Sequence, residues 1–153
     1  MQVLIIAVGK ESSAELAKLQ ATYEQRLQTL ATITWKLLPA SRAAEADQVR
    51  TQDSERILGC LKANDAVVLL DERGEQQTNE QFAATFNRLA GAQGRLVFVI
   101  GGAFGVTDEM RSRAQFVWSF SKLVFPHQLI RVMLLEQIYR TFMVQKGHPY
   151  HHS

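Results

Sequence analysis

The side chains best suited to chemistry near neutral pH gather at the C-terminus. The segment His148-Pro149-Tyr150-His151-His152 follows Gly147, a residue type that often ends a helix. Histidine exchanges protons near pH 7, and tyrosine can donate a hydrogen bond or stack on a ring. A metal site is not expected, because no cysteine or carboxylate stands nearby to complete a ligand set. The tail is therefore a candidate reactive segment, with an idle frayed terminus as the alternative.

A glycine-rich segment is the second candidate. Gly101-Gly102-Ala103-Phe104-Gly105 follows the apolar run 96–100, and Thr107 can cap a helix that starts with Asp108 and Glu109. Glycines here allow a ligand to approach the backbone closely. The segment lacks the spacing of a dinucleotide fingerprint and the Gly-Lys-Ser/Thr of a P-loop, and its two acidic residues would repel phosphate. We expect a ligand that is not held by a polyphosphate, or else a tight turn without a ligand.

A second apolar stretch leads to another loop. Residues 116–125 are nearly all apolar or small and predict a strand that ends at Pro126. Pro126 suits the first turn of the helix that runs on from His127. Loops that follow neighbouring strands of a parallel sheet lie at the same edge. The sequence thus predicts a pocket at this edge, with the tail at its mouth.

The helix from His127 is apolar on more than one face. One stripe contains Ile130, Leu134, Ile138 and Phe142, and outside it fall Leu129, Val132, Tyr139 and Met143. Such a helix needs two partners, for instance the sheet and another subunit, so we predict a homodimer. Glu136 and Arg140 are four residues apart in the order that favours an ion pair within the helix.

The preceding residues predict the frame of the fold. Apolar runs at 3–8, 32–38, 66–70 and 96–100 alternate with helical patterns, which is typical of a parallel α/β sheet. Capping boxes are expected at Ser12 with Glu15 and at Thr78 with Gln81. No repeat or linker interrupts the chain. We therefore expect residues 1–153 to form a single α/β domain.

Residues 41–47 are polar and rich in alanine, and we expect a loop there that leads into a helix. This loop is the best candidate for a mobile segment. Arg42 and Arg50 could contact a partner from it, although solvated surface charge is the more common role for either residue.

Composition leaves the partner open. The 153 residues have a net charge of +2, whereas a dedicated nucleic-acid binder usually has a larger basic excess. A basic RNA-binding surface would have to be local, or doubled in a symmetric dimer. No apolar run is long enough to span a membrane, and the N-terminus does not have the pattern of a signal peptide. The single cysteine, Cys60, excludes an internal disulfide, so we expect a cytoplasmic protein.

Three segments resemble one known family: VIGGAFG, SFSKLVFPHQLIRVMLLEQIYRTF and GHPYHHS. They are similar to the small bacterial SPOUT methyltransferases that act on a pseudouridine of large-subunit ribosomal RNA, the ribosomal RNA large subunit methyltransferase H family. The opening VLIIAVGK and the strand AVVLLDERG extend the resemblance over nearly the whole chain. The Phe-Pro-His helix start followed by the HPYH tail is its specific part.

The resemblance implies S-adenosylmethionine as cofactor and N3-methylation of a pseudouridine in 23S ribosomal RNA by a homodimer on the assembled ribosome. It also implies a C-terminal trefoil knot, which sequence patterns alone do not predict. The cofactor contacts that it implies are Leu70, Gly101, Gly102, Phe120, Ser121, Lys122, Leu123, Val124 and Phe125. Relatives often carry Lys or Arg after the HPYH motif, where this chain has His152.

The reaction requires a group that removes the N3 proton or stabilises the deprotonated ring. We predict that the tail supplies it, through His151 or His148, and that Tyr150 stacks on the uracil or binds it by a hydrogen bond. His127 and Arg131, one helical turn apart, are candidates for binding RNA phosphate, or for capping and pairing within a dimer. The alternatives are a non-catalytic ribosome-binding protein of this fold and a transfer-RNA methyltransferase of the same superfamily.

Overall fold

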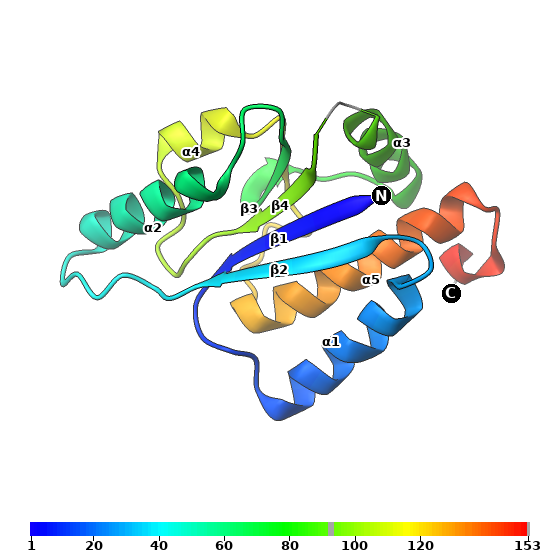
Figure 1. Cartoon of the computed structure of the whole chain (residues 1–153), viewed down its shortest axis with the longest axis horizontal. Helices are drawn as coiled ribbons and strands as arrows, with labels where there is room; N and C mark the ends of the chain where they lie inside the picture. The colour runs from blue at the N-terminus through cyan, green and yellow to red at the C-terminus, as the bar shows by residue number, and fades with distance from the viewer. Residues whose placement is uncertain (92–93, 153) are drawn as a thin grey trace.

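The computed structural model describes residues 1–91 and 94–152, except for the side chain of His151. Strands and helices alternate along the described chain (Figure 1). The strands are β1 (Gln2–Val8), β2 (Thr32–Leu38), β3 (Ala66–Glu75), β4 (Leu96–Ile100) and β5 (Phe116–Trp118). The α-helices are α1 (Ala14–Leu27), α2 (Ala46–Cys60), α3 (Asn79–Ala90), α4 (Asp108–Arg113) and α5 (His127–Gln145), and a short 3₁₀ helix spans Pro149–His152.

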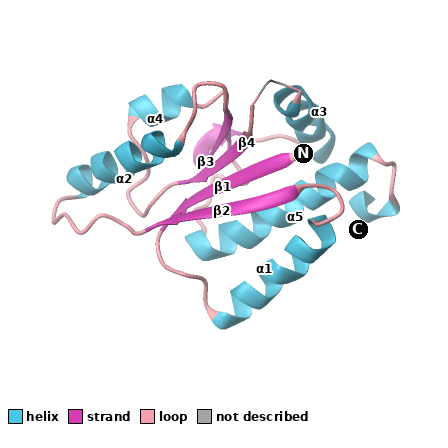
Figure 2. Ribbon diagram, viewed as in Figure 1, coloured by secondary structure: helices cyan, strands magenta, loops and turns pink. Residues whose placement is uncertain are grey.

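The strands form one parallel sheet in the order β2-β1-β4-β3-β5, which confirms the predicted α/β class. Residues 3–8 of β1 and all of β4 are buried, because helices cover both faces of the sheet. Figure 2 shows α2 and α4 on one side and α1 and α5 on the other. Alternate residues of β1 accordingly enter two cores, with Val3, Ile5 and Ala7 in one and Leu4, Ile6 and Val8 in the other.

Of the two predicted capping boxes, one is present and one is not. The capping box of α3 is present: Thr78 Oγ1 accepts a hydrogen bond from Gln81 N, and Gln81 Oε1 accepts one from Thr78 N. The box expected at Ser12 is wrong, because Ser13 caps α1 by accepting a hydrogen bond from Leu16 N. Ser12 Oγ lies instead within hydrogen-bonding distance of Arg131 on α5.

Strand β5 is much shorter than predicted. The sequence indicated a strand over 116–125, but pairing with β3 ends at Trp118. Ser119 N–H makes the last backbone hydrogen bond to β3, at Glu75 O, and the Ser119 hydroxyl lies within hydrogen-bonding distance of the carbonyl oxygens of Glu72 and Ser121. These serine contacts turn an apolar stretch into a fixed loop instead of a longer strand.

Helix α5 finds much of its apolar packing inside the chain. It lies against the sheet and against both α1 and α3. Val132 and Met143, which the periodicity placed outside the main stripe, are 5% exposed. Their burial therefore does not require a second subunit, and the homodimer stays a prediction. In the described part of the chain, no helix has the length and apolarity needed to cross a membrane.

The end of α5 is fixed by glycine, as expected. Gly147 has a φ of 61°, and its N–H donates to Val144 O while His148 N–H donates to Met143 O. This hydrogen-bond pair is a Schellman motif, which reverses the chain at a helix end. It folds the tail back along α5.

Candidate active site

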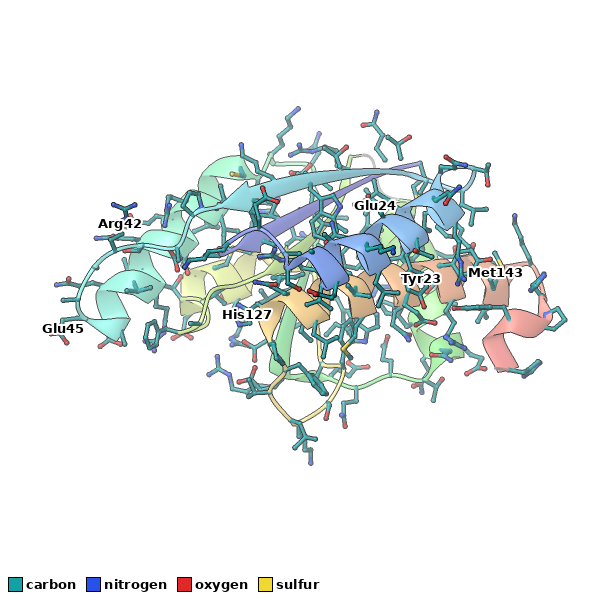
Figure 3. All side chains as sticks on the ribbon, turned by 90° about the horizontal axis from the view of Figure 1, so that it is seen from below. Tyr23, Glu24, Arg42, Glu45, His127 and Met143 are labelled. Carbon is teal, nitrogen blue, oxygen red and sulfur yellow. The ribbon has the colours of Figure 1, made fainter. Side chains whose placement is uncertain are left out.

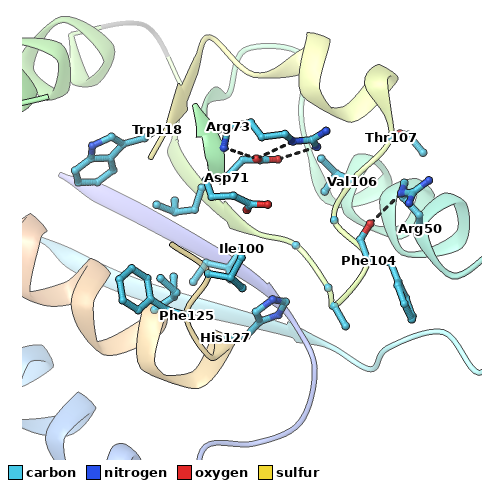
Figure 4. A pocket seen from close by; sticks show the side chains of 18 of the residues that line it. Arg50, Asp71, Arg73, Ile100, Phe104, Val106, Thr107, Trp118, Phe125 and His127 are labelled. Carbon is cyan, nitrogen blue, oxygen red and sulfur yellow. Dashed lines mark hydrogen bonds and ion pairs between the residues drawn. The ribbon is translucent and has the colours of Figure 1, made fainter. Parts of the chain in front are cut away.

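A pocket of about 870 Å³ opens at the carboxyl ends of β3, β4 and β5 (Figure 4). Its walls are the end of β3, the glycine loop 101–107, the loop 119–125 and the first turns of α2 and α5. Crevices at this edge of a parallel sheet are the usual ligand sites of α/β proteins. The pocket therefore occupies the place that the sequence predicted.

Most of the predicted cofactor residues line this pocket. They are Leu70, Gly101, Gly102, Phe120, Ser121, Leu123, Val124 and Phe125. Lys122 lies in a shallow adjoining hollow with Arg73 and Glu72. The fold thus brings residues that are up to 55 positions apart in the sequence to one cavity, from Leu70 to Phe125.

The glycine loop is a tight turn held by close packing. Gly105 N–H donates to Gly102 O at 3.1 Å, and Gly105 has a φ of 74°. A Cβ on Gly102 would lie 2.7 Å from Asp53 Oδ2, and one on Gly101 would lie 2.9 Å from Val106 Cγ1. A side chain at either position would therefore displace Asp53 or Val106, whatever ligand approaches the loop.

Helix α2 holds this loop through a stripe of polar residues that the sequence reading missed. Arg50 Nε donates to Phe104 O at 2.9 Å, and Ser54 Oγ accepts from Thr107 N at 2.9 Å. Asp53, between them, is buried beside Gly102. Polar residues at positions i, i+3 and i+4 share a helix face, which was the available signal. Arg50 therefore belongs to α2 and contacts the glycine loop, while no contact tests the role expected for Arg42.

Asp71, at the end of the buried part of β3, lines the pocket and links β3 to helix α4. Its carboxylate accepts a hydrogen bond from Arg111 Nη2 on α4 at 2.6 Å and others from the backbone and side chain of Arg73. Burial raises the pKa of the Asp71 carboxyl, but the hydrogen bonds from Arg73 and Arg111 outweigh this and hold it below its usual range. Asp71 is therefore ionised at neutral pH.

Replacing Asp71 should show how much its ion pairs stabilise the fold. We expect Asp71→Asn to lower the free energy of unfolding by about 2 kcal/mol at pH 7, because an amide cannot balance two guanidinium groups. The folded pKa lies below the unfolded one, so this stability is present above about pH 4 and is lost as the pH falls through the folded pKa. Urea unfolding at pH 7 and near pH 2.5 measures the difference.

Asp47→Asn is the matched control for Asp71→Asn. The Asp47 side chain pairs with Arg50 but is 89% exposed, so the change should cost less than about 1 kcal/mol. A difference between Asp71→Asn and wild type that stayed the same at both pH values would contradict the assigned role of the Asp71 carboxylate.

The loop 119–125 lines the pocket and is held by local contacts. Ser121 Oγ accepts a hydrogen bond from Leu123 N, and Phe120 packs edge-on against Trp118. Leu123 and Val124 are 70% and 77% exposed. The serine hydroxyls and Phe120 therefore hold this loop, whereas Leu123 and Val124 extend outward.

The two predicted RNA-binding residues of α5 differ in their surroundings. His127 lines the pocket, and burial followed by the charge of Arg131 lowers its pKa, against a small opposing effect of Glu72. Arg131 is only 3% exposed, and its Nη1 donates to Lys10 O at 2.8 Å. It therefore fastens the connection between β1 and α1, which is not the exposed position that a direct phosphate contact requires. Its role toward RNA stays a prediction.

The tail lies away from the pocket of its own chain. Tyr150 Oη donates to Glu136 Oε1 at 3.1 Å, its ring lies under Arg140, and its carbonyl accepts from Arg140 Nη1. Burial, together with hydrogen bonding to Tyr23 and Glu136, raises the pKa of Tyr150, which is therefore a neutral phenol. Glu136 is nine residues beyond His127, a separation of about 14 Å along the helix.

Figure 3 shows the same separation, with His127 at one end of α5 and Met143 near the other. Among the described residues, none beyond Ile130 lines the pocket. His148 follows the helix end, and the His151 side chain lies outside the described structure. Tyr150 and His148 are thus not brought to the cofactor residues within one chain, and the prediction for His151 falls on a side chain outside the described structure.

A parallel α/β sheet with a glycine loop and a second loop around a pocket at its carboxyl edge defines a class of protein, the α/β proteins with a ligand crevice at that edge. The family model described as "Predicted SPOUT methyltransferase" matches residues 1–151. The chain therefore belongs to the SPOUT methyltransferase family and is a methyltransferase. Membership implies the trefoil knot that the sequence resemblance suggested.

Several curated relatives carry the name "Ribosomal RNA large subunit methyltransferase H". The protein of Exiguobacterium sibiricum is 39% identical over 99% of both chains, and that of Geobacter metallireducens is 38% identical over 100% of both. A solved structure, a probable methylase family protein from Haemophilus influenzae, matches with a TM-score of 0.52 at 14% identity. The match covers 95% of this chain and 66% of that one, and it supports the fold.

Proposed function

We propose that this protein transfers a methyl group from S-adenosylmethionine to N3 of a pseudouridine in 23S ribosomal RNA on the assembled ribosome. The pocket at the carboxyl ends of β3, β4 and β5 carries the proposal, because it gathers the residues that the family resemblance assigns to the cofactor. The relatives named for large-subunit ribosomal RNA support the substrate class. A ribosomal substrate would place the protein in the cytoplasm.

The lining of the pocket suits this methyl donor. Phe120 offers apolar surface for an adenine ring above the buried Trp118 and Ile100, and the loop 119–125 offers backbone groups for its polar edge. Glu72 and Asp108, which also line the pocket, suit a ligand that carries positive charge. S-adenosylmethionine supplies, when bound, a methyl group on a positively charged sulfur. The chain itself has to orient the donor, exclude water and provide a group for the N3 proton.

The tail is the proposed source of that group, and it must come from a second copy of the chain. In its own chain it is fastened to α5 by Tyr150, away from the pocket at the start of the helix. A two-fold axis that sets two α5 helices antiparallel would place each tail beside the pocket of the other subunit. We therefore propose a homodimer in which His151 or His148 of one subunit acts on the uracil at the other.

Tyr150 has a defined place in this arrangement. Its hydroxyl and ring are engaged with Glu136 and Arg140, so we propose that it positions the tail, in addition to the contact with the target ring predicted from the sequence. His127, which lines the pocket, remains the better placed of the two residues proposed to bind RNA.

The assembled ribosome is the proposed substrate because the net charge of +2 is small for a protein that grips naked RNA. A pre-shaped substrate can be recognised through many weak contacts instead. The nearly equal numbers of basic and acidic residues also fit a protein that contacts RNA through a few basic groups near the pocket.

The test is transfer of labelled methyl from S-adenosylmethionine to assembled ribosomes, free large subunits and transfer RNA in parallel. The ribosomes should lack this modification. We expect label on assembled ribosomes alone, mapped to N3 of one pseudouridine, and inhibition by S-adenosylhomocysteine. Label on transfer RNA would favour the transfer-RNA enzyme, and failure to bind the donor would favour the non-catalytic ribosome-binding protein.

A further inference from the structure

The mouth of the pocket carries an unusual share of exposed apolar surface. In the described part of the chain five large apolar side chains are exposed, and three of them line this pocket: Phe104 at 49%, Leu123 at 70% and Val124 at 77%. Leu123 and Val124 belong to the loop 119–125. Phe104 stands across the mouth on the glycine loop, opposite Phe125 (Figure 4). It is the one aromatic side chain of the three.

The backbone beneath Phe104 is held from two sides. The turn closes through the hydrogen bond from Gly105 N to Gly102 O, and Arg50 Nε binds the carbonyl oxygen of Phe104 itself at 2.9 Å. Asp47 in turn pairs with Arg50 at 2.7 Å. A fixed backbone presents an aromatic ring at a low cost in conformational entropy, because only two side-chain torsions remain to be ordered. The ring is therefore a preorganised surface and not a loose loop tip.

The volume of the pocket and the charges near its entrance indicate which kind of ligand contacts the Phe104 ring. The pocket of about 870 Å³ is near the upper end of the range for small-molecule sites, roughly 300–1,000 Å³, so it has room for a nucleotide beside the donor. The exposed Lys122 lies in the adjoining hollow with Arg73, which pairs with Asp71 and keeps its side chain 65% exposed. Cations beside an exposed aromatic ring are the combination that binds unpaired nucleotides, with phosphates on the cations and bases on the ring.

We propose that Phe104 is a stacking platform for a nucleobase of the RNA substrate at the mouth of the methyl-transfer pocket. This inference rests on the proposed function and adds a residue that recognises the substrate. The base is either the target uracil or a neighbour in the same unpaired segment, since stacking requires only a flat face.

Three substitutions test the proposal. Phe104→Ala should raise KM for ribosomes about 5- to 100-fold with kcat nearly unchanged, as expected when a stacking contact is lost. Phe104→Trp should retain or improve KM. Phe104→Leu keeps apolar volume without an aromatic face and should resemble Phe104→Ala. A wild-type KM for Phe104→Leu or Phe104→Ala would overturn the stacking role.

Two control measurements exclude other roles for this side chain. Affinity for S-adenosylmethionine, from calorimetry, should be unchanged in Phe104→Ala, and so should the oligomeric state in sedimentation. A variant that loses donor affinity would make Phe104 part of the cofactor site, and one that dissociates would make it a subunit contact. Either result would overturn the proposal.

Direct binding separates this inference from the proposed function. Cosedimentation with ribosomes, without donor, should be weaker for Phe104→Ala than for wild type whether or not methyl is transferred. Absence of transfer by the wild type, with this difference in binding intact, would refute the proposed reaction and leave the RNA contact standing. Equal binding of the two proteins would refute the contact even if the reaction is confirmed.

Discussion

Two inactive variants should restore methyl transfer when they are combined. His151→Ala should reduce single-turnover transfer by about 10²- to 10⁴-fold, the usual range for loss of an acid–base group, and should leave donor binding intact. Leu70→Trp should block the donor site, because Leu70 lines the pocket and the larger ring would fill it. Mixed dimers of the two variants should then regain activity.

The expected recovery follows from the position of the tail. Within one chain Tyr150 is hydrogen-bonded to Glu136, about 14 Å along α5 from His127, which lines the pocket. If the tail serves the partner's pocket, each mixed dimer contains one site with an intact pocket and an intact tail. Random exchange gives half mixed dimers, so activity should reach about one quarter of the wild type.

The measurement is single-turnover transfer to ribosomes after the two variants have been unfolded and refolded together. Each variant refolded alone is the control, and both should show the unfolding transition of the wild type. No recovery in the mixture would mean that each tail serves its own pocket. Full activity in both His151→Ala and Tyr150→Phe would remove the tail from the chemistry altogether.

A large loss of stability is expected on substitution of Gly74. A Cβ there would lie 2.6 Å from Val117 O and 2.7 Å from Val117 C, which are backbone atoms of β5 that cannot move independently. Gly74→Ala should therefore lower the free energy of unfolding by about 3 kcal/mol or more. It should also weaken donor binding, because the pairing of β3 with β5 positions the loop 119–125.

Gly59→Ala is the matched control, measured with Gly74→Ala in the same urea-unfolding experiment. Gly59 lies in α2, and no atom stands within 4 Å of the Cβ that it would gain. Alanine is favoured over glycine in a helix, so this change should be neutral or stabilise the protein by up to about 1 kcal/mol. If both variants were as stable as the wild type, the close approach of β3 and β5 would not constrain residue 74.

The amino-acid sequence by itself determined the frame of this protein. Apolar runs such as 3–8 and 96–100 can be buried on both faces only in a covered parallel sheet, and local signals such as Thr78 with Gln81 fix helix starts. The Phe-Pro-His helix start and the HPYH tail indicated the family that the comparison then showed. Each of these signals acts between near neighbours in the chain, which is why the sequence reveals it.

Only the tertiary structure decided which distant groups meet. Arg50 reaches Phe104 across 54 residues, and Asp71 reaches Arg111 across 40, because strand order and helix packing bring these elements together. The periodicity of apolar residues predicts which residues are buried, but it does not predict which elements cover them. The same limit concealed the separation of the tail from the pocket, since the length and direction of α5 place Tyr150 beside Glu136, well away from the start of the helix.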